Sequence, residues 1–224
     1  MGKLFDYDGI FMTVINRFAS LIWLGILTLV FCIPVITAGA SFTAMHYAVF
    51  KLRDGDKGYV TQNFLHSFKM NIKQSTILWI IVALIGAVLY ADFLILFRST
   101  YNFSIILKVF TGLVAFIYSL TVVFIFLLQA RFDNTVRQTL KNSFLMGMFH
   151  LPKTVLIIFL HIFPFVLLFA YPVIYPAVLV LGISLPAFFN AALFIGIFKK
   201  YMPQDEAEQT YVDEEVSSGE EEFD

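Results

Sequence analysis

An uninterrupted run of uncharged residues near the N-terminus constrains this fold more than any other feature. The 32 residues from 18 to 49 contain no Asp, Glu, Lys or Arg. A transmembrane helix needs about 20 apolar residues, so this run is too long for one straight span and too short for two good ones. Pro34 lacks a backbone donor and Gly39 relaxes the backbone, which predicts a break. We therefore expect a span over residues 19–36, an irregular turn, and a short helix over residues 42–52.

The remaining composition predicts several more spans. Hydrophobic residues make up 59% of the chain and charged residues 14%, whereas soluble domains are roughly 45–50% apolar and about 25% charged. The excess lies in long uncharged runs, so we expect an all-α, polytopic membrane helix bundle with about five transmembrane helices. The four further spans are predicted at residues 76–97, 105–128, 154–171 and 177–198.

Two segments between the predicted spans have the periodicity of short amphipathic helices. The first has an apolar stripe and a basic face, formed respectively by Phe64, Phe68 and Ile72, and by His66, Lys69 and Lys73. The second repeats this pattern 76 residues later, with a stripe of Val136, Leu140, Phe144 and Met148 beside Arg137 and Lys141. The constant offset suggests a parallel repeat of surface helix, span and span, although any two amphipathic helices share some periodicity.

Several segments also carry a family resemblance. The opening GKLFDYD, then WLGILTLVFCIPVITAGASFTAMHYAVFKL and GYVTQNFLHSFKMNIKQSTILW, resemble the YesL-like family of bacterial integral membrane proteins. The resemblance covers residues 1–98 and returns more weakly in KNSFLMGMFHLPKTVL and FFNAALFIGIFKKY. It implies a multi-span bacterial protein that is often encoded beside carbohydrate uptake systems of the ABC type. The family has no established reaction, so the resemblance implies no catalytic residues.

The distribution of charge predicts the orientation. With five spans, eleven Lys and Arg residues fall on one side and four, including Arg17, on the other. The positive-inside rule then places the C-terminus and both amphipathic helices in the cytoplasm, and the N-terminus outside. Residues 1–202 form the membrane domain, with all 15 Lys and Arg residues and six acids. Residues 203–224 hold the other ten acids and no base, which predicts a disordered acidic tail that solvates the chain, pairs with the basic helices or meets a basic partner.

No motif for enzymatic chemistry is present. The chain lacks phosphate-binding loops, a HExxH zinc motif and a GxSxG nucleophile motif, and its four histidines are too scattered for a metal site. We therefore expect no enzyme activity, cofactor, metal or nucleic-acid partner. His161 and Asn190 lie in the middle of the last two predicted spans, where unpaired polar groups are costly. They either satisfy structural hydrogen bonds, such as one to the carbonyl freed by Pro164, or form a polar site on a transport path. Asp92 and His46 are weaker candidates, and Cys32 is expected to be an inert packed thiol.

The basic faces of the two amphipathic helices are the main candidates for a working surface. Lys69, Lys73, Arg137 and Lys141 either hold the helices against anionic lipid or dock on an acidic partner. Two functions follow. The first is a non-enzymatic accessory or regulatory subunit of a carbohydrate ABC uptake system, in contact with the bilayer and with permease or ATPase subunits. The second is a small transporter or channel acting alone through the polar midplane residues.

Overall fold

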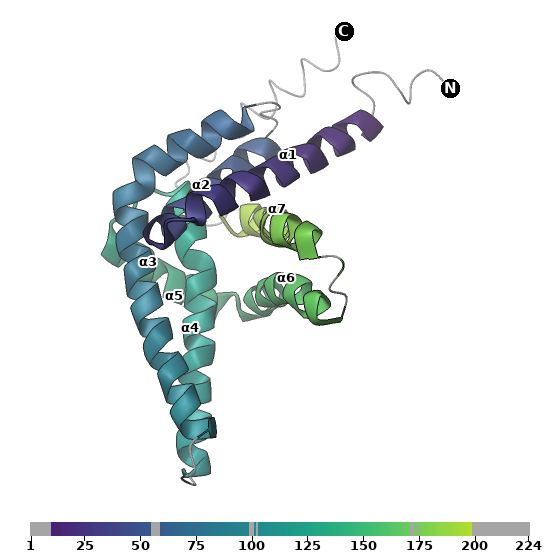
Figure 1. The fold of residues 1–224 in the computed structure, drawn as a ribbon. Coiled ribbons are helices and arrows are strands. Elements are labelled where there is room, and N and C mark those ends of the chain that lie inside the picture. Colours follow the sequence, from purple (N-terminus) through teal and green to yellow (C-terminus); the bar gives the residue numbers. More distant parts are fainter. Residues whose placement is uncertain are drawn as a thin grey trace. The chain divides into compact units, whose positions relative to one another are not determined.

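The computed structural model describes residues 10–54, 59–98, 101, 103–170, 173 and 175–198, and within these ranges the chain is helical without any strand. This confirms the predicted all-α class. Figure 1 shows the arrangement of the helices. In chain order the elements are α1 (Ile10–Cys32), the 3-10 turn η2 (Val35–Thr37), α2 (Ala38–Arg53), α3 (Val60–Arg98), α4 (Ile105–Arg131), α5 (Val136–Phe149), α6 (Leu151–Ala170) and α7 (Tyr175–Phe198).

The chain divides into two units, Met1–Phe188 and Phe189–Asp224. The first unit contains α1 to α6 and the first part of α7, and all packing described below belongs to it. The second unit contains the rest of α7. The predicted acidic tail, residues 203–224, lies outside the described residues.

Three helices of the described part are long and apolar enough to cross a membrane. They are α1 from Met12 onward, α3 and α4. The adjoining helices α5 and α6, up to Pro164, are bent by 102° and would form a fourth, broken span. The apolar stretch described in α7, Val180–Ile195, is shorter. The polytopic membrane architecture is therefore confirmed. Among the described residues three or four helices are candidate spans, and the five predicted spans with their bounds stay a prediction.

The first predicted surface helix is not a separate element. It is the beginning of α3, which runs unbroken for 39 residues, or about 58 Å at 1.5 Å per residue. This is nearly twice the roughly 30 Å of a hydrocarbon core, so part of α3 extends beyond a single span. The aromatic stripe predicted to lie on lipid instead packs on α1, because the Phe31 ring lies 5.4 Å from that of Phe64 and 4.8 Å from that of Phe68.

The predicted break in the N-terminal run is confirmed, and it turns the chain back on itself. Helix α1 ends at Cys32, and α2 begins at Ala38, four residues earlier than expected. Thr37 explains how so tight a turn satisfies its backbone. Its hydroxyl donates to the carbonyl oxygens of Phe31 and Pro34, at 2.8 Å each, and its N–H donates to Pro34 at 2.9 Å. A turn in apolar surroundings requires such pairing of its backbone N–H and C=O groups within the protein.

Helix α2 is the core of the first unit. Twelve of its sixteen residues are buried, and it packs against α1, α3 and α4. Small residues allow this close packing, as is common between membrane helices. A Cβ atom on Gly39 would lie only 2.5 Å from the carbonyl oxygen of Ser75. One turn further on, the buried hydroxyls of Thr43 and Ser75 share a 2.9 Å hydrogen bond.

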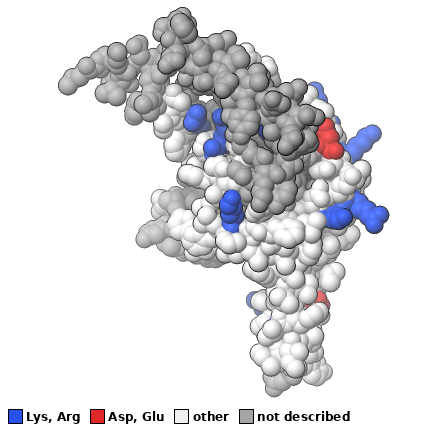
Figure 2. Space-filling view, turned by 180° about the vertical axis from the view of Figure 1, so that it is seen from behind, with Lys and Arg blue, Asp and Glu red and all other residues white. Residues whose placement is uncertain are grey.

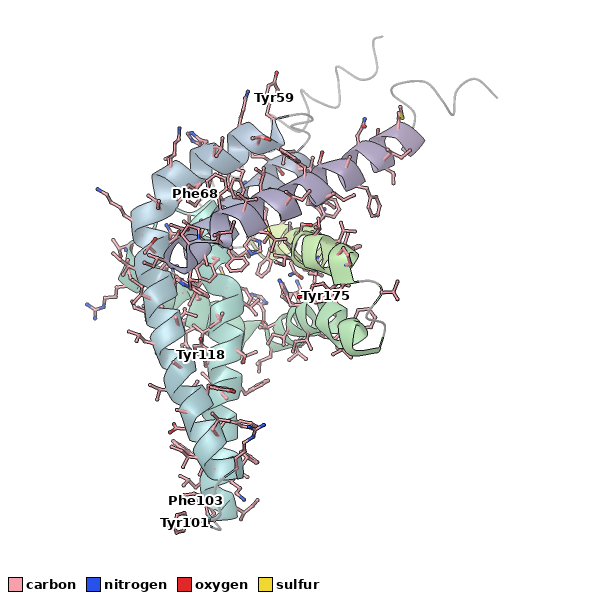
Figure 3. All side chains as sticks on the ribbon, in the orientation of Figure 1. Tyr59, Phe68, Tyr101, Phe103, Tyr118 and Tyr175 are labelled. Atoms are coloured by element: carbon pink, nitrogen blue, oxygen red, sulfur yellow. The ribbon has the colours of Figure 1, made fainter. Side chains whose placement is uncertain are left out.

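Helices α3 and α4 continue from this core as a long antiparallel hairpin (Figure 1). Midway along it, the Tyr118 hydroxyl donates to the carbonyl oxygen of Val82 at 2.8 Å. Tyr101 and Phe103 lie at the far tip, as Figure 3 shows, and Lys108 lies over the Phe97 ring at 5.7 Å. Aromatic and basic residues are typical of a membrane–water interface, so we assign the tip to one face of the bilayer.

Candidate functional site

The four basic residues selected from the sequence are all exposed. Lys69 and Lys73 lie on the first part of α3, and Arg137 and Lys141 lie on α5. Figure 2 shows that Lys and Arg side chains gather on the part of the molecule away from the α3–α4 tip, which is almost entirely uncharged in this view. The charge asymmetry predicted from the sequence therefore corresponds to a physical separation along the first unit.

A buried polar network lies between the two basic helices and joins them to α4. Its centre is Gln129, which is only 4% exposed. The Oε1 atom of Gln129 accepts hydrogen bonds from Gln74 on α3 and Thr139 on α5, both at 3.1 Å. Its Nε2 atom donates to Oδ1 of Asn71 on α3 at 3.1 Å. One amide thus bridges three helices, and the basic side chains stand on a fixed scaffold.

The start of α5 is fixed by a second set of polar contacts. Thr135 and Gln138 form a capping box, in which the Thr135 hydroxyl accepts from the Gln138 N–H at 3.4 Å and the Gln138 Oε1 accepts from the Thr135 N–H at 2.9 Å. The Gln74 side chain also donates to the carbonyl oxygen of Asn134, just before this cap. These contacts begin the helix at a defined residue and hold Arg137 close to α3.

Helix α5 turns a face of small residues inward, next to its predicted apolar stripe. Its buried residues are Thr139, Ser143 and Gly147, which recur every four residues. A Cβ atom on Gly147 would lie 2.9 Å from the carbonyl oxygen of Leu120 on α4. The predicted apolar stripe is divided, because Val136 and Leu140 pack against the core residues around Leu78 and Ile125, whereas Phe144 is 43% and Met148 40% exposed. Small residues inside and large apolar residues outside are expected of a helix surrounded by lipid.

The two segments of the proposed repeat agree in one buried position and differ in the helices that follow. Ser67 and Ser143, which correspond at the 76-residue offset, are both buried. The following junctions differ, however, because α3 continues straight through while α5 ends at Phe149 and α6 leaves at a 102° bend. The internal repeat stays a prediction.

The midplane candidates lie in different units. His161 is in α6, and its Nδ1 atom lies 3.0 Å from the carbonyl oxygen of Ile157, so the Nδ1–H tautomer donates within the same helix. This is one turn back from His161 itself, rather than the Leu160 carbonyl that Pro164 leaves free. Asn190 is buried in α7, within the second unit. That these two residues meet stays a prediction.

The weaker candidates differ in their surroundings. His46 lies in the buried helix α2, is 8% exposed, and has an Nδ1 atom without a hydrogen-bond partner among the described residues. Asp92 is exposed on α3. Cys32 is a free, half-buried thiol at the end of α1. Within the described ranges, no group of three or more His, Cys, Asp or Glu side chains could hold a metal ion.

Sequence reasoning missed the polar network and the close helix contacts. The TxxQ pattern at residues 135–138 is a recognisable capping-box signal. Gln129 sits directly after a predicted span that ends at residue 128, where an amide has no obvious partner in lipid. Nothing in the sequence, however, identifies its three partners, because they come from two other helices, at separations of 10, 55 and 58 residues.

Comparison with known families gives a match over part of the chain. Residues 18–93, about a third of the sequence, match the family described as "Protein of unknown function, DUF624". The matched region contains most of α1, all of α2 and most of α3, and therefore the core described above. No curated protein and no solved structure matches the chain. The N-terminal helices of this chain are thus similar to DUF624 proteins.

Proposed function

We propose that this protein is a non-enzymatic integral membrane subunit that assists or regulates a carbohydrate ABC uptake system in the bacterial cytoplasmic membrane. The observation that carries the proposal is the exposure of basic residues on two helices that one polar network connects, namely Lys69, Lys73, Arg137 and Lys141. All four side chains are exposed, on helices that the Gln129 network fixes to α4. A charged surface on a rigid support loses little backbone freedom on docking.

The link to carbohydrate uptake rests on family resemblance. The match to DUF624 over residues 18–93 is compatible with the YesL-like resemblance, because YesL-like proteins are DUF624 members. The partner in this proposal is a permease or ATPase subunit with an acidic cytoplasmic surface. Charge complementarity would orient the two proteins and speed their encounter.

Detergent co-purification tests this docking directly. The variant Lys69→Glu/Lys73→Glu/Arg137→Glu/Lys141→Glu should lose the permease subunits that the wild-type chain retains at low salt. The matched control reverses Arg98 and Lys108, two bases near the α3–α4 tip, and should retain them. High salt should release the wild-type complex, because exposed charges are screened beyond roughly 8 Å at physiological ionic strength and over shorter distances above it. Retention by the quadruple variant would refute the proposal.

A transporter acting alone is the second candidate, favoured by the buried histidine of α2. A buried imidazole nitrogen with no hydrogen-bond partner among the described residues, as at His46, is costly in an apolar bundle, and buried histidines are found on ion and proton paths. Solute uptake by the purified chain in liposomes, abolished by His46→Ala and by His161→Ala or Asn190→Ala, would support this candidate. It would also undercut the accessory function.

A further inference from the structure

Three arginines, one each from α1, α2 and α4, lie at one end of the first unit. In an antiparallel helical pair, residues equally distant from the turn lie opposite each other. Arg17 and Arg53 are each 18 positions from Val35 in the turn, and the charge of Arg17 lies close enough to contribute to lowering the pKa of Arg53, after the larger effect of burial. Arg131 at the end of α4 joins them, because it lies 3.6 Å from Asp54, the residue after Arg53.

Arg53 and Arg131 each lie over an aromatic ring, and both interact with the same carboxylate, that of Asp54. Arg53 lies over the Phe188 ring at 5.4 Å and donates to the Phe188 carbonyl oxygen at 3.4 Å. Arg131 lies over the Phe50 ring at 5.8 Å. Asp54 interacts with both Arg131 and Arg53, so one carboxylate serves two of the three guanidinium groups. An additional anion would relieve their mutual repulsion.

The surface beside these arginines is apolar and exposed. Between Arg17 and the α1–α2 turn, α1 exposes large side chains that face away from the bundle, namely Phe18, Ile22 and Ile26, each 37–48% exposed. In a membrane protein such side chains lie against lipid chains. A ligand that covers both features needs an anionic group for the arginines and an apolar part for α1.

We propose that Arg17, Arg53 and Arg131 form a binding site for the phosphodiester of an anionic phospholipid headgroup, with its acyl chains lying along α1. Guanidinium groups suit this ligand because their planar donors bind two phosphate oxygens at once. The site requires the start of α1 and the end of α2 to lie on the same membrane face. This revises the expected external N-terminus, and it moves Arg17 to the basic, cytoplasmic side, as the positive-inside rule favours.

The site can be tested on the full-length chain in neutral detergent by titration with short-chain phosphatidylglycerol and native mass spectrometry. A basic residue near an anionic lipid is worth about 1 kcal/mol, so each of Arg17→Gln, Arg53→Gln and Arg131→Gln should weaken binding about fivefold. The triple variant should show no specific binding of phosphatidylglycerol. Lys108→Gln is the matched control, because Lys108 also lies over a phenylalanine ring but at the opposite end, and it should bind normally.

Two further arms separate the sources of phosphate and the classes of partner. Glycerol phosphate should compete only at concentrations far above those of the lipid; equal affinity would mean a site for a soluble anion and would overturn the proposal. Unchanged phosphatidylglycerol binding by the triple variant, or loss of a co-purifying protein with lipid binding intact, would overturn it too. Arg17→Gln keeps the test valid if Arg53→Gln fails to fold, because the Arg17 side chain is exposed.

Discussion

Replacing Gly39 by alanine should separate the two most closely packed helices of the molecule. The new Cβ atom would lie 2.5 Å from the Ser75 carbonyl oxygen and 2.6 Å from the Cβ atom of Trp79. Ordinary contacts of this kind begin at 3.4 Å, so α2 and α3 must move apart by close to an ångström. That shift would also stretch the 2.9 Å hydrogen bond between Thr43 and Ser75.

The expected loss combines three terms. Overpacking a close contact costs about 1–3 kcal/mol, and a weakened hydrogen bond between membrane helices costs roughly 0.6 kcal/mol. Alanine recovers up to about 1 kcal/mol through its higher helix propensity than glycine. The net loss is about 2 kcal/mol, which should lower the Tm by about 4–8 °C for a chain of this size.

Thermal unfolding of the purified chain in one detergent measures this loss. Gly112→Ala is the matched control, because Gly112 also lies within a helix but has no atom within 4 Å of its added Cβ. It should leave the Tm unchanged or raise it. If Gly39→Ala were as stable as the wild type, or if both variants lost stability equally, the close packing of α2 on α3 would be refuted.

Three other predictions follow from the packing and charge of the chain. Gln129→Leu removes three hydrogen bonds of the buried network and should cost about 2 kcal/mol, at roughly 0.6 kcal/mol each, measured as a lower Tm. Gln62→Leu, on the exposed side of α3, should change the Tm little. Equal effects of the two variants would show that the network contributes nothing to stability. In a Cys32→Ser background, a membrane-impermeant maleimide added outside cells should label Tyr101→Cys at the tip but not Val14→Cys or Asp133→Cys. If Val14→Cys were labelled and Asp133→Cys were not, the N-terminus would lie outside. Removing residues 203–224 takes away ten carboxylates and should increase retention on phosphatidylglycerol vesicles at low salt but not at high salt, while equal retention of both chains would show that the tail does not compete for the bases.

The spans were predictable where burying charge decides the outcome. A charged side chain at the centre of a bilayer costs several kcal/mol, so charge-free runs mark α1, α3 and α4 with little ambiguity. The break near Pro34 was predictable for the same kind of reason, because proline removes a backbone donor. The continuity of α3 was not, because whether the aromatic stripe of Phe64 and Phe68 lies on lipid or on another helix depends on α1, a distant part of the chain.

The inner face of α5 was unpredictable from periodicity alone. Its apolar stripe and its face of small residues both recur at helical spacing, and the solvent decides how much of the stripe is buried beside the small residues. In water the stripe would turn inward to leave the solvent. In lipid that driving force is absent, so close backbone approach decides instead, and Gly147 packs against Leu120. The Gln129 network was equally hidden, because its hydrogen bonds join residues separated by 10 to 58 positions.

The exposed apolar end of α5 limits what kind of partner the basic residues of this helix can meet. On α5 the outward apolar residues Phe144 and Met148 lie on the same helix as the exposed bases Arg137 and Lys141. A helix that exposes both must lie where hydrocarbon gives way to headgroups, with its basic side chains at the level of the phosphates. A soluble acidic protein would reach these bases only above the headgroups, in competition with anionic lipid. A partner that docks on this face should therefore also be embedded in the membrane, which favours a permease subunit over an ATPase subunit, and co-purification of the ATPase without the permease would contradict this reasoning.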